Sequence, residues 1–281
     1  MSVAAYPSWP IRFEYGATVY VFPTHAMEWE TEQNLRVATA DAPLGSYGID
    51  LAGGGPVGRA IATERISYIV LEDNAVALEQ HLNELRAMIA RAPLGKLWKR
   101  DATNQQFWAY ARPAKMPSMT YGVQQMRHMP VTLEFVRLSD WYSASAHQFT
   151  WIVTANGATT NIQQLGTIPS TMLEIIISPY GTSSPYATQP VLENAATGER
   201  VRWAITLNNS NHRLHIDASR FRVRKSTDGG ATWTSAWQEI ELGPVQATLF
   251  TLRPGSNTFI VTHNGGSISL MIEFIWHDAY A

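Results

Sequence analysis

The sequence predicts a mainly β protein: first a β-sandwich or split-barrel domain with one α-helix, then a second β-sandwich domain. Short two-faced strands alternate with turns rich in Gly, Asp and Asn from Arg200 to His277. The length of 281 residues exceeds the roughly 100 to 200 residues of a usual domain, which favours two domains. An aromatic content of 11% suits a β-rich protein, because strands favour aromatic rings.

Strands dominate the first domain, which is expected to span residues 1–145. Ile11, Phe13 and Tyr15 alternate with charged neighbours, and a second strand follows Gly16 as far as Phe22. Residues 41–59 contain six Gly and two Pro, which predicts a long flexible loop. The other strands of this domain are expected at 61–71, 106–111 and 129–138.

A single helix is expected from Asp73 to Ala92. Leucines at 78, 82 and 85, with Met88 or Ile89, recur at helical spacing and predict one apolar face. Asp73 is expected to cap the first turn, and Pro93 with Gly95 is expected to end the helix.

The second domain is expected at 146–281, with a boundary near Trp141. Residues 143–166 are interpreted as a linker followed by a first strand at 149–153, and Leu173 to Ile177 as a buried strand. Later strands are predicted at 200–207, 214–217, 221–224 and around Phe259 and Val261. The last strand has one strongly apolar face and one mixed face. Its apolar stripe consists of Ile268, Leu270, Ile272, Phe274 and Trp276.

Composition narrows the possible functions. Only 16% of residues are charged, below the roughly 25% of soluble domains, which favours surface hidden in an assembly over a simply neutral β protein. A net charge of −2 gives no footprint for specific nucleic-acid binding. The absence of cysteine excludes disulfides and thiolate metal sites. Without a signal-peptide pattern or an apolar run of about 20 residues, the chain is expected to be soluble, made in the cytoplasm and not inserted in membranes.

One motif has a sharp sequence pattern. Residues 226–233 (STDGGATW) fit the Asp box of sialidases and other β-propellers. A propeller needs several copies, and this chain has one. The motif is therefore interpreted as a structural turn, in which Asp228 accepts backbone hydrogen bonds, Gly230 supplies positive φ and Trp233 packs over the loop. No catalytic constellation is identified, and no enzyme activity is expected.

Three other groups of residues are candidates for binding. Surface tryptophans stack on sugars, so Trp203, Trp233 and Trp237 are candidate carbohydrate-binding residues. The alternative is that they fill the core or an interface. His212, His215 and Asp217 are candidate metal ligands. They are interpreted instead as part of a polar strand face, and no metal or cofactor is expected. Glutamates at 28, 30 and 32 alternate along one strand face. They are interpreted as a solvated edge that discourages strand pairing.

Several segments form a recognisable order along the chain. A strand ends in Asp140, Trp141 and Tyr142, and the pair Asn156-Gly157 follows it. Three further segments are residues 194–199 (NAATGE), 214–217 (LHID) and 250–259 (FTLRPGSNTF). In this order, which covers nearly the whole chain, the sequence resembles the distal tail proteins of long-tailed (siphovirus) bacteriophages.

The resemblance implies a virion protein of the tail tip and baseplate, assembled in the host cytoplasm. It implies a homo-hexameric ring around the DNA channel, with residues 1–145 as the ring-forming belt domain and 146–281 as a galectin-like sandwich. In such a ring, Glu28, Glu30 and Glu32 are candidate channel-facing residues instead of a solvated edge. Its partners would be the tail tube and tail hub proteins, with tape measure and host-attachment fibre proteins. The alternative function is a carbohydrate-binding protein that recognises a cell surface.

Overall fold

The computed structural model describes residues 9–23, 28–32, 39–41, 48–50, 62–92, 94–119, 127–182, 184–243, 249–265 and 267–281. The chain divides into two compact units, Met1–Trp141 and Tyr142–Ala281. The described residues form many antiparallel strands and one α-helix, which confirms the mainly β class. No helix among them is long and apolar enough to cross a membrane.

The main sheet of the first unit follows the order β2-β1-β7-β8-β10-β6-β3. Its strands are β1 (Trp9–Tyr15), β2 (Thr18–Val21), β3 (Glu28–Glu32), β6 (Ala62–Leu71), β7 (Gly95–Arg100), β8 (Gln106–Pro113) and β10 (His128–Arg137), with β9 (Ser118–Met119) paired to β10. In β6 and β10, every second residue is buried, as period-two alternation requires. The edge strands are β2 and β3.

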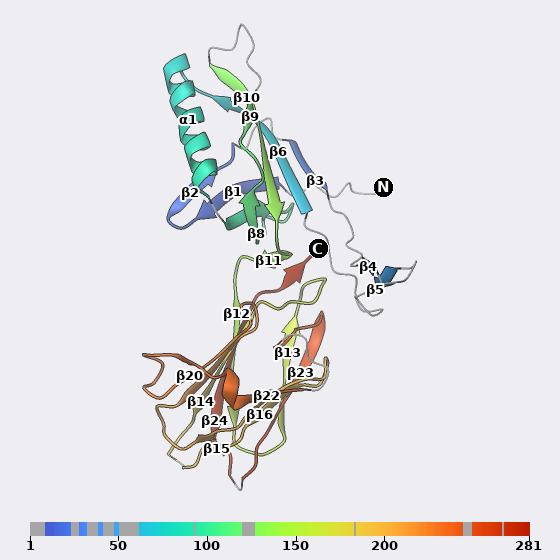
Figure 1. Ribbon diagram of the computed structural model, residues 1–281, viewed down its shortest axis with the longest axis vertical. Coiled ribbons are helices and arrows are strands. Elements are labelled where there is room, and N and C mark those ends of the chain that lie inside the picture. The colour runs from blue at the N-terminus through green and yellow to red at the C-terminus, as the bar shows by residue number, and fades with distance from the viewer. Residues whose placement is uncertain are drawn as a thin grey trace. The chain divides into compact units, whose positions relative to one another are not determined.

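Helix α1 (Ala75–Arg91) lies along one face of this sheet (Figure 1). The predicted apolar face is buried, with both Met88 and Ile89 on it. The predicted cap is wrong by one residue. Asn74, not Asp73, is the N-cap, because its extended backbone lets its side chain accept hydrogen bonds from Val76 N and Ala77 N at 3.0 Å.

Sequence patterns missed several strands of the first unit. β7 was not predicted, and the predicted loop at 41–59 contains β5 (Gly48–Asp50), which pairs with β4 (Thr39–Asp41). A pairing of three residues is too short to produce a visible alternation. The Gly-rich run at 53–58 lies outside the described residues.

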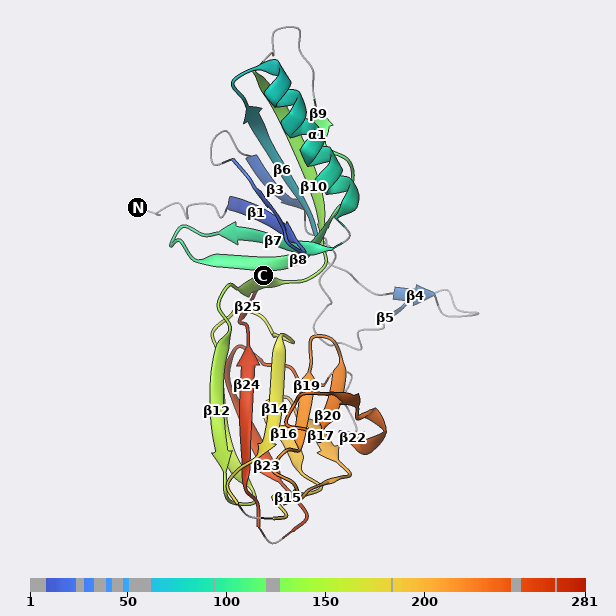
Figure 2. The same cartoon turned by 90° about the vertical axis from the view of Figure 1, so that its left-hand side faces the viewer.

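The second unit is a sandwich of two antiparallel sheets (Figure 2). The six-stranded sheet has the order β12 (His147–Val153), β24 (Leu270–Trp276), β14 (Leu173–Pro179), β19 (Arg213–Asp217), β20 (Arg222–Ser226) and β21 (Thr234–Ser235). The five-stranded sheet has the order β13 (Ala158–Gln164), β23 (Gly255–Thr262), β16 (Val191–Asn194), β17 (Glu199–Trp203) and β22 (Ile240–Leu242). Shorter elements are β11 (Trp141–Ser143), β15 (Ala187–Thr188), β18 (Thr206–Leu207), β25 (Ala279–Tyr280) and a 3-10 turn, η1 (Trp237–Glu239).

The sandwich core agrees with the predicted apolar stripe of the last strand. All five stripe residues are buried, and they pack with side chains from the opposite sheet. Two predictions for this unit are wrong. Residues 158–164 form β13 instead of a linker. Phe221 was expected in a strand, but it lies before β20 and its side chain is exposed. Phe221 has a φ of 51° and is 48% exposed, so its backbone turns before β20 begins.

Candidate functional site

The Asp-box segment forms the hairpin between β20 and β21. Asp228 Oδ1 accepts a hydrogen bond from Ser226 Oγ (2.6 Å) and one from Thr232 N (2.9 Å), while Asp228 Oδ2 accepts one from Thr232 Oγ1 (2.6 Å). These bonds, the one from Ser226 first, hold the pKa of Asp228 well below its ordinary value. Gly230 has a φ of 101°, which favours glycine. The geometry is that of a structural turn, because both carboxylate oxygens serve the loop itself.

Beyond the turn, Trp233 covers part of the outer face of the six-stranded sheet. Its ring lies 5.3 Å from the ring of His215, and the Arg224 guanidinium lies 5.6 Å from its centre. Arg224 Nη2 lies 2.8 Å from His215 Nδ1, and His215 Nε2 lies 3.4 Å from a carboxylate oxygen of Glu174. The hydrogen bond from His215 lowers the pKa of Glu174. An indole ring, an imidazole, a guanidinium and a carboxylate thus meet on one sheet face.

The candidate carbohydrate residues have different environments. Trp203 is 0% exposed and belongs to the sandwich core, so the idea that it stacks on a sugar is wrong. Its strand faces the opposite sheet, and period-two alternation puts it inside together with Val201. Trp233 and Trp237 are half-buried. Trp237 packs against the exposed Phe221 with ring centres 4.9 Å apart and the rings tilted, a pair that the sequence did not predict.

The three residues considered for a metal do not form a ligand set. His215 is engaged by Arg224, and Asp217 Oδ1 accepts hydrogen bonds from Ser219 Oγ (2.7 Å) and Arg220 N (3.1 Å). His212 lies in the turn before β19, where its N–H donates to Asn209 O. Among the described residues, no three His, Cys, Asp or Glu side chains are grouped to hold a metal ion.

The predicted acidic stripe lies on the edge strand β3. Glu28 is paired with Ser67, Glu30 with Arg65 and Glu32 with Thr63, so the three residues share one face of the strand. Glu28 and Glu30 are exposed, and Glu30 Oε2 lies 3.4 Å from Arg65 Nη1. This geometry is consistent with edge protection by charge.

The opposite face of β3 leads to a buried ion pair that sequence patterns missed. Glu64 Oε1 accepts a hydrogen bond from Arg137 Nε (2.7 Å), and Glu64 Oε2 accepts one from Trp29 Nε1 (2.9 Å). Both charged side chains are at most 4% exposed. Burial, followed by repulsion from Arg137, lowers the pKa of Lys99 to about 8. Glu64 and Arg137 stand at positions where alternation predicts apolar residues, which is the signal that could have identified them.

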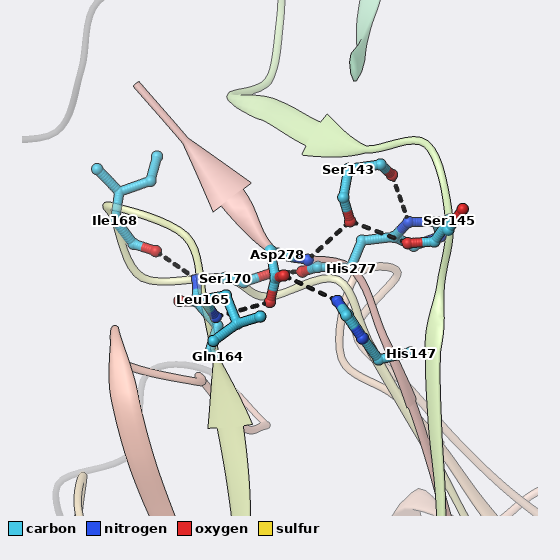
Figure 3. A network of polar contacts seen from close by, with 9 residues as sticks. All are labelled: Ser143, Ser145, His147, Gln164, Leu165, Ile168, Ser170, His277 and Asp278. Carbon is cyan, nitrogen blue, oxygen red and sulfur yellow. Dashed lines mark hydrogen bonds and ion pairs between the residues drawn. The ribbon is translucent and has the colours of Figure 1, made fainter. Parts of the chain in front are cut away.

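A polar network links the start and end of the second unit (Figure 3). Asp278 Oδ2 lies 2.8 Å from His147 Nε2, and Asp278 Oδ1 accepts a hydrogen bond from Leu165 N (2.9 Å). Ser143 Oγ donates to Ser145 O and accepts from Asp278 N. The serine, histidine and aspartate types of a hydrolase are present, but the serine hydroxyl bonds backbone groups instead of the imidazole. The network joins strands of the second unit by hydrogen bonds and has a structural role.

No protein-family model and no curated protein matches this sequence. Among solved structures, the chain is similar to Dit (gp 19.1) of phage SPP1, presented as a paradigm of the hub adsorption apparatus in Gram-positive infecting phages. The TM-score is 0.55 at 12% identity, over 90% of this chain and 92% of that chain. Two structures of the phage p2 baseplate in its activated conformation, with Ca and with Sr, have TM-scores of 0.47 at 9% identity, over 95% of this chain and 97% of those chains. The match to SPP1 Dit shows a shared fold, as the resemblance to distal tail proteins implied.

Proposed function

We propose that this chain is a structural protein of a bacteriophage tail tip. The observation that supports this most is the fold it shares with SPP1 Dit across both units, since the match covers 90% of the chain. In this proposal it forms a homo-hexameric ring that joins the tail tube to the hub, baseplate and host-recognition proteins. Residues 1–145 form the ring, and 146–281 form a galectin-like module.

Charge supports a ring that surrounds DNA without binding it. The net charge is −2, and a duplex is attracted by clustered Lys and Arg, not by such a surface. Within the proposal, the face of β3 that carries Glu28, Glu30 and Glu32 lines the channel and repels the phosphate backbone. A structure of the assembled ring that places this stripe on the outer wall would contradict this part.

The proposed protein works by assembly, without catalysis. The two groups of residues that resemble enzyme motifs, the Asp box and the Asp278 network, use their polar atoms in hydrogen bonds that hold the fold. Asp228 holds its own turn, and the Asp278 network fastens strands of the second unit. A closed ring needs two different complementary patches on each subunit. In this proposal the edge strand β2, which carries the exposed valines Val19 and Val21, contributes apolar surface to one of these patches.

The test is the mass and symmetry of the purified full-length protein. Native mass spectrometry at physiological salt is expected to give a species of six chains, and negative-stain class averages are expected to show six-fold rings with a central opening. A protein that stays monomeric at concentrations well above those of a virion assembly reaction would overturn the ring.

A second candidate function is recognition of cell-surface carbohydrate. It is favoured by one observation, the contact between the exposed ring of Phe221 and the half-buried ring of Trp237. A sugar face stacks on such rings. On a glycan array, binding by the parent protein that is lost in Trp237→Ala and kept in Leu165→Ala, another exposed apolar position, would support this function. No binding to any glycan by the parent would exclude it.

A further inference from the structure

Three positions of the second unit combine an Asn or Asp residue with a following glycine. They are Asn156-Gly157, Asp228-Gly229 and Asn264-Gly265. In such pairs the backbone nitrogen of the glycine can attack the side-chain carbonyl carbon of the residue before it, because glycine has no Cβ to hinder the approach. Each pair lies in a connection between two strands, so the local hydrogen bonds decide which pair can react.

The reaction of an asparagine has two steps and consumes only water. The glycine N–H gives its proton to the solvent, and a bond forms from that nitrogen to the side-chain Cγ. The Cγ–Nδ2 bond breaks, and the amide nitrogen leaves as ammonia after it takes a proton from the solvent. Water then opens the five-membered ring at either carbonyl carbon, which leaves an aspartate or an isoaspartate.

At Asn156 the fold holds both reacting groups. Gly157 N donates a hydrogen bond to Val261 O (2.9 Å), which occupies the attacking N–H. Asn156 Oδ1 accepts a hydrogen bond from His263 N (3.0 Å), which fixes the side-chain amide. Attack therefore requires both bonds to open first, and each bond that must open slows the reaction by about two- to tenfold.

Asp228 is held in a different way. Gly229 N donates to Asn211 O (2.8 Å), so its N–H is also occupied. The carboxyl group must be protonated before it can lose water in the same ring closure. The hydrogen bonds from Ser226 and Thr232 hold the pKa of Asp228 well below its ordinary value, so the group stays a carboxylate near neutral pH.

Asn264 lacks these restraints. In the part of the chain that the structure describes, neither Gly265 N–H nor Asn264 Oδ1 takes part in a hydrogen bond. Both residues are exposed. Asn264 Nδ2 donates to Gln189 Oε1 (2.8 Å), but this contact is exposed and water can replace either partner. The attacking nitrogen and the carbon it attacks are thus both open to solvent.

We propose that Asn264 is a site of spontaneous deamidation in the folded protein, and that hydrogen bonds protect the other two pairs. The product places a carboxylate where Nδ2 now donates to Gln189 Oε1, which keeps its bond from Arg202 Nη2 (2.6 Å). The proposal does not depend on ring formation, since the reaction takes place within one connection of one chain.

The test is peptide mapping by mass spectrometry of the full-length protein during incubation at pH 8 and 37 °C. Conversion of each amide to an acid raises the peptide mass, and fragmentation identifies isoaspartate. In the folded protein, Asn264 is expected to react at least about tenfold faster than Asn156, where two more bonds must open. In urea, where both pairs are exposed, the two rates are expected to become comparable.

A matched pair of variants assigns the signal. Asn264→Gln is expected to abolish the fast reaction, because a side chain longer by one carbon closes its ring far more slowly. Asn208→Gln, at an exposed asparagine that no glycine follows, is expected to leave the fast reaction unchanged.

Three results for the parent protein would overturn the proposal, and none of them depends on a variant folding. One is an equal rate at Asn264 and Asn156 in the folded protein. Another is a ratio of the two rates that stays the same in urea, which would assign the difference to neighbouring residues instead of the fold. The third is no reaction of folded Asn264 over a time in which the unfolded chain reacts there.

Discussion

Glu64 has no access to water, so the residues around it must balance its charge. Arg137 Nε and Trp29 Nε1 both donate to its carboxylate, and both ionic side chains are buried. Removing one partner leaves the other charge buried and uncompensated. We therefore expect Arg137→Met to lower the free energy of unfolding by about 3 to 5 kcal/mol, measured by urea denaturation of the full chain.

The double variant Glu64→Gln, Arg137→Met tests the reason for this loss. It removes both charges, and we expect it to recover most of the stability. Glu30→Gln is the matched control, since it breaks an exposed pair with Arg65 and should cost less than about 1 kcal/mol. Equal losses in the double and single variants would show that shape, not charge, explains the effect.

A second prediction at the residue scale concerns His263. Burial lowers its pKa, and neither ring nitrogen has a hydrogen-bond partner among the described residues. The folded protein thus binds this proton less readily than the unfolded chain does. The stabilising difference is fully present above about pH 6.5, the unfolded value, and is lost as the pH falls towards the lower folded value.

We expect His263→Gln to lose less stability than the parent when the pH is lowered from 7 to 5. Thermal unfolding at the two pH values measures this difference. As the control, Ser267→Ala changes an exposed side chain of the same unit that carries no titratable group, so it should leave the pH dependence unchanged. Parallel stability curves for the parent and His263→Gln would refute the prediction.

At the scale of elements, the start of α1 distinguishes two adjacent polar residues. Asn74 accepts hydrogen bonds from two backbone N–H groups, whereas Asp73 stands one residue before the cap. We expect Asn74→Ala to cost about 1 kcal/mol of unfolding free energy and Asp73→Ala to cost close to nothing, by urea denaturation. A larger loss of stability in Asp73→Ala than in Asn74→Ala would show that Asp73 is the N-cap, as the sequence predicted.

Strands were predictable where one face is apolar along several residues. β24 showed this pattern fully, and its stripe is buried as expected. β13 was missed because its sequence, ATTNIQQ, has a single large apolar residue, Ile162. β3 reads EWETE, and its inner residue Trp29 bonds a buried carboxylate. Such strands form because they pair with strands far away in the sequence, and this pairing leaves no alternating pattern in their own residues.

The candidate site was less predictable than the fold. The Asp-box turn could be inferred, because its bonds join residues within one short segment. The Glu64–Arg137 pair joins residues 73 positions apart, and the Tyr20–His81 contact joins residues 61 positions apart. The sheet order brings the first pair together, and the packing of α1 beside β2 brings the second together. For Trp203 the alternation with Val201 indicated the buried face, but a strand of five residues is too short to decide between core and surface.

At the scale of the whole molecule, each unit contains its own buried centre. The sandwich core is formed by residues of the second unit alone, and the buried faces of β6 and β10 belong to the first. Units with separate cores are expected to open separately. A destabilising core substitution in one unit should therefore leave the amide hydrogen-exchange protection of the other unit unchanged.

Phe274→Ala tests this independence. Phe274 is 0% exposed in β24, so its truncation should cost about 3 to 5 kcal/mol. Hydrogen exchange of the full chain is expected to show faster opening of β14 and β24 with unchanged protection of β6 and β10. Ile275→Ala, on the half-buried opposite face of the same strand, should have a much smaller effect. If β6 and β10 lost protection together with β24, the two units would unfold as one cooperative body, and a lesion anywhere in the sandwich would also weaken the proposed ring-forming unit.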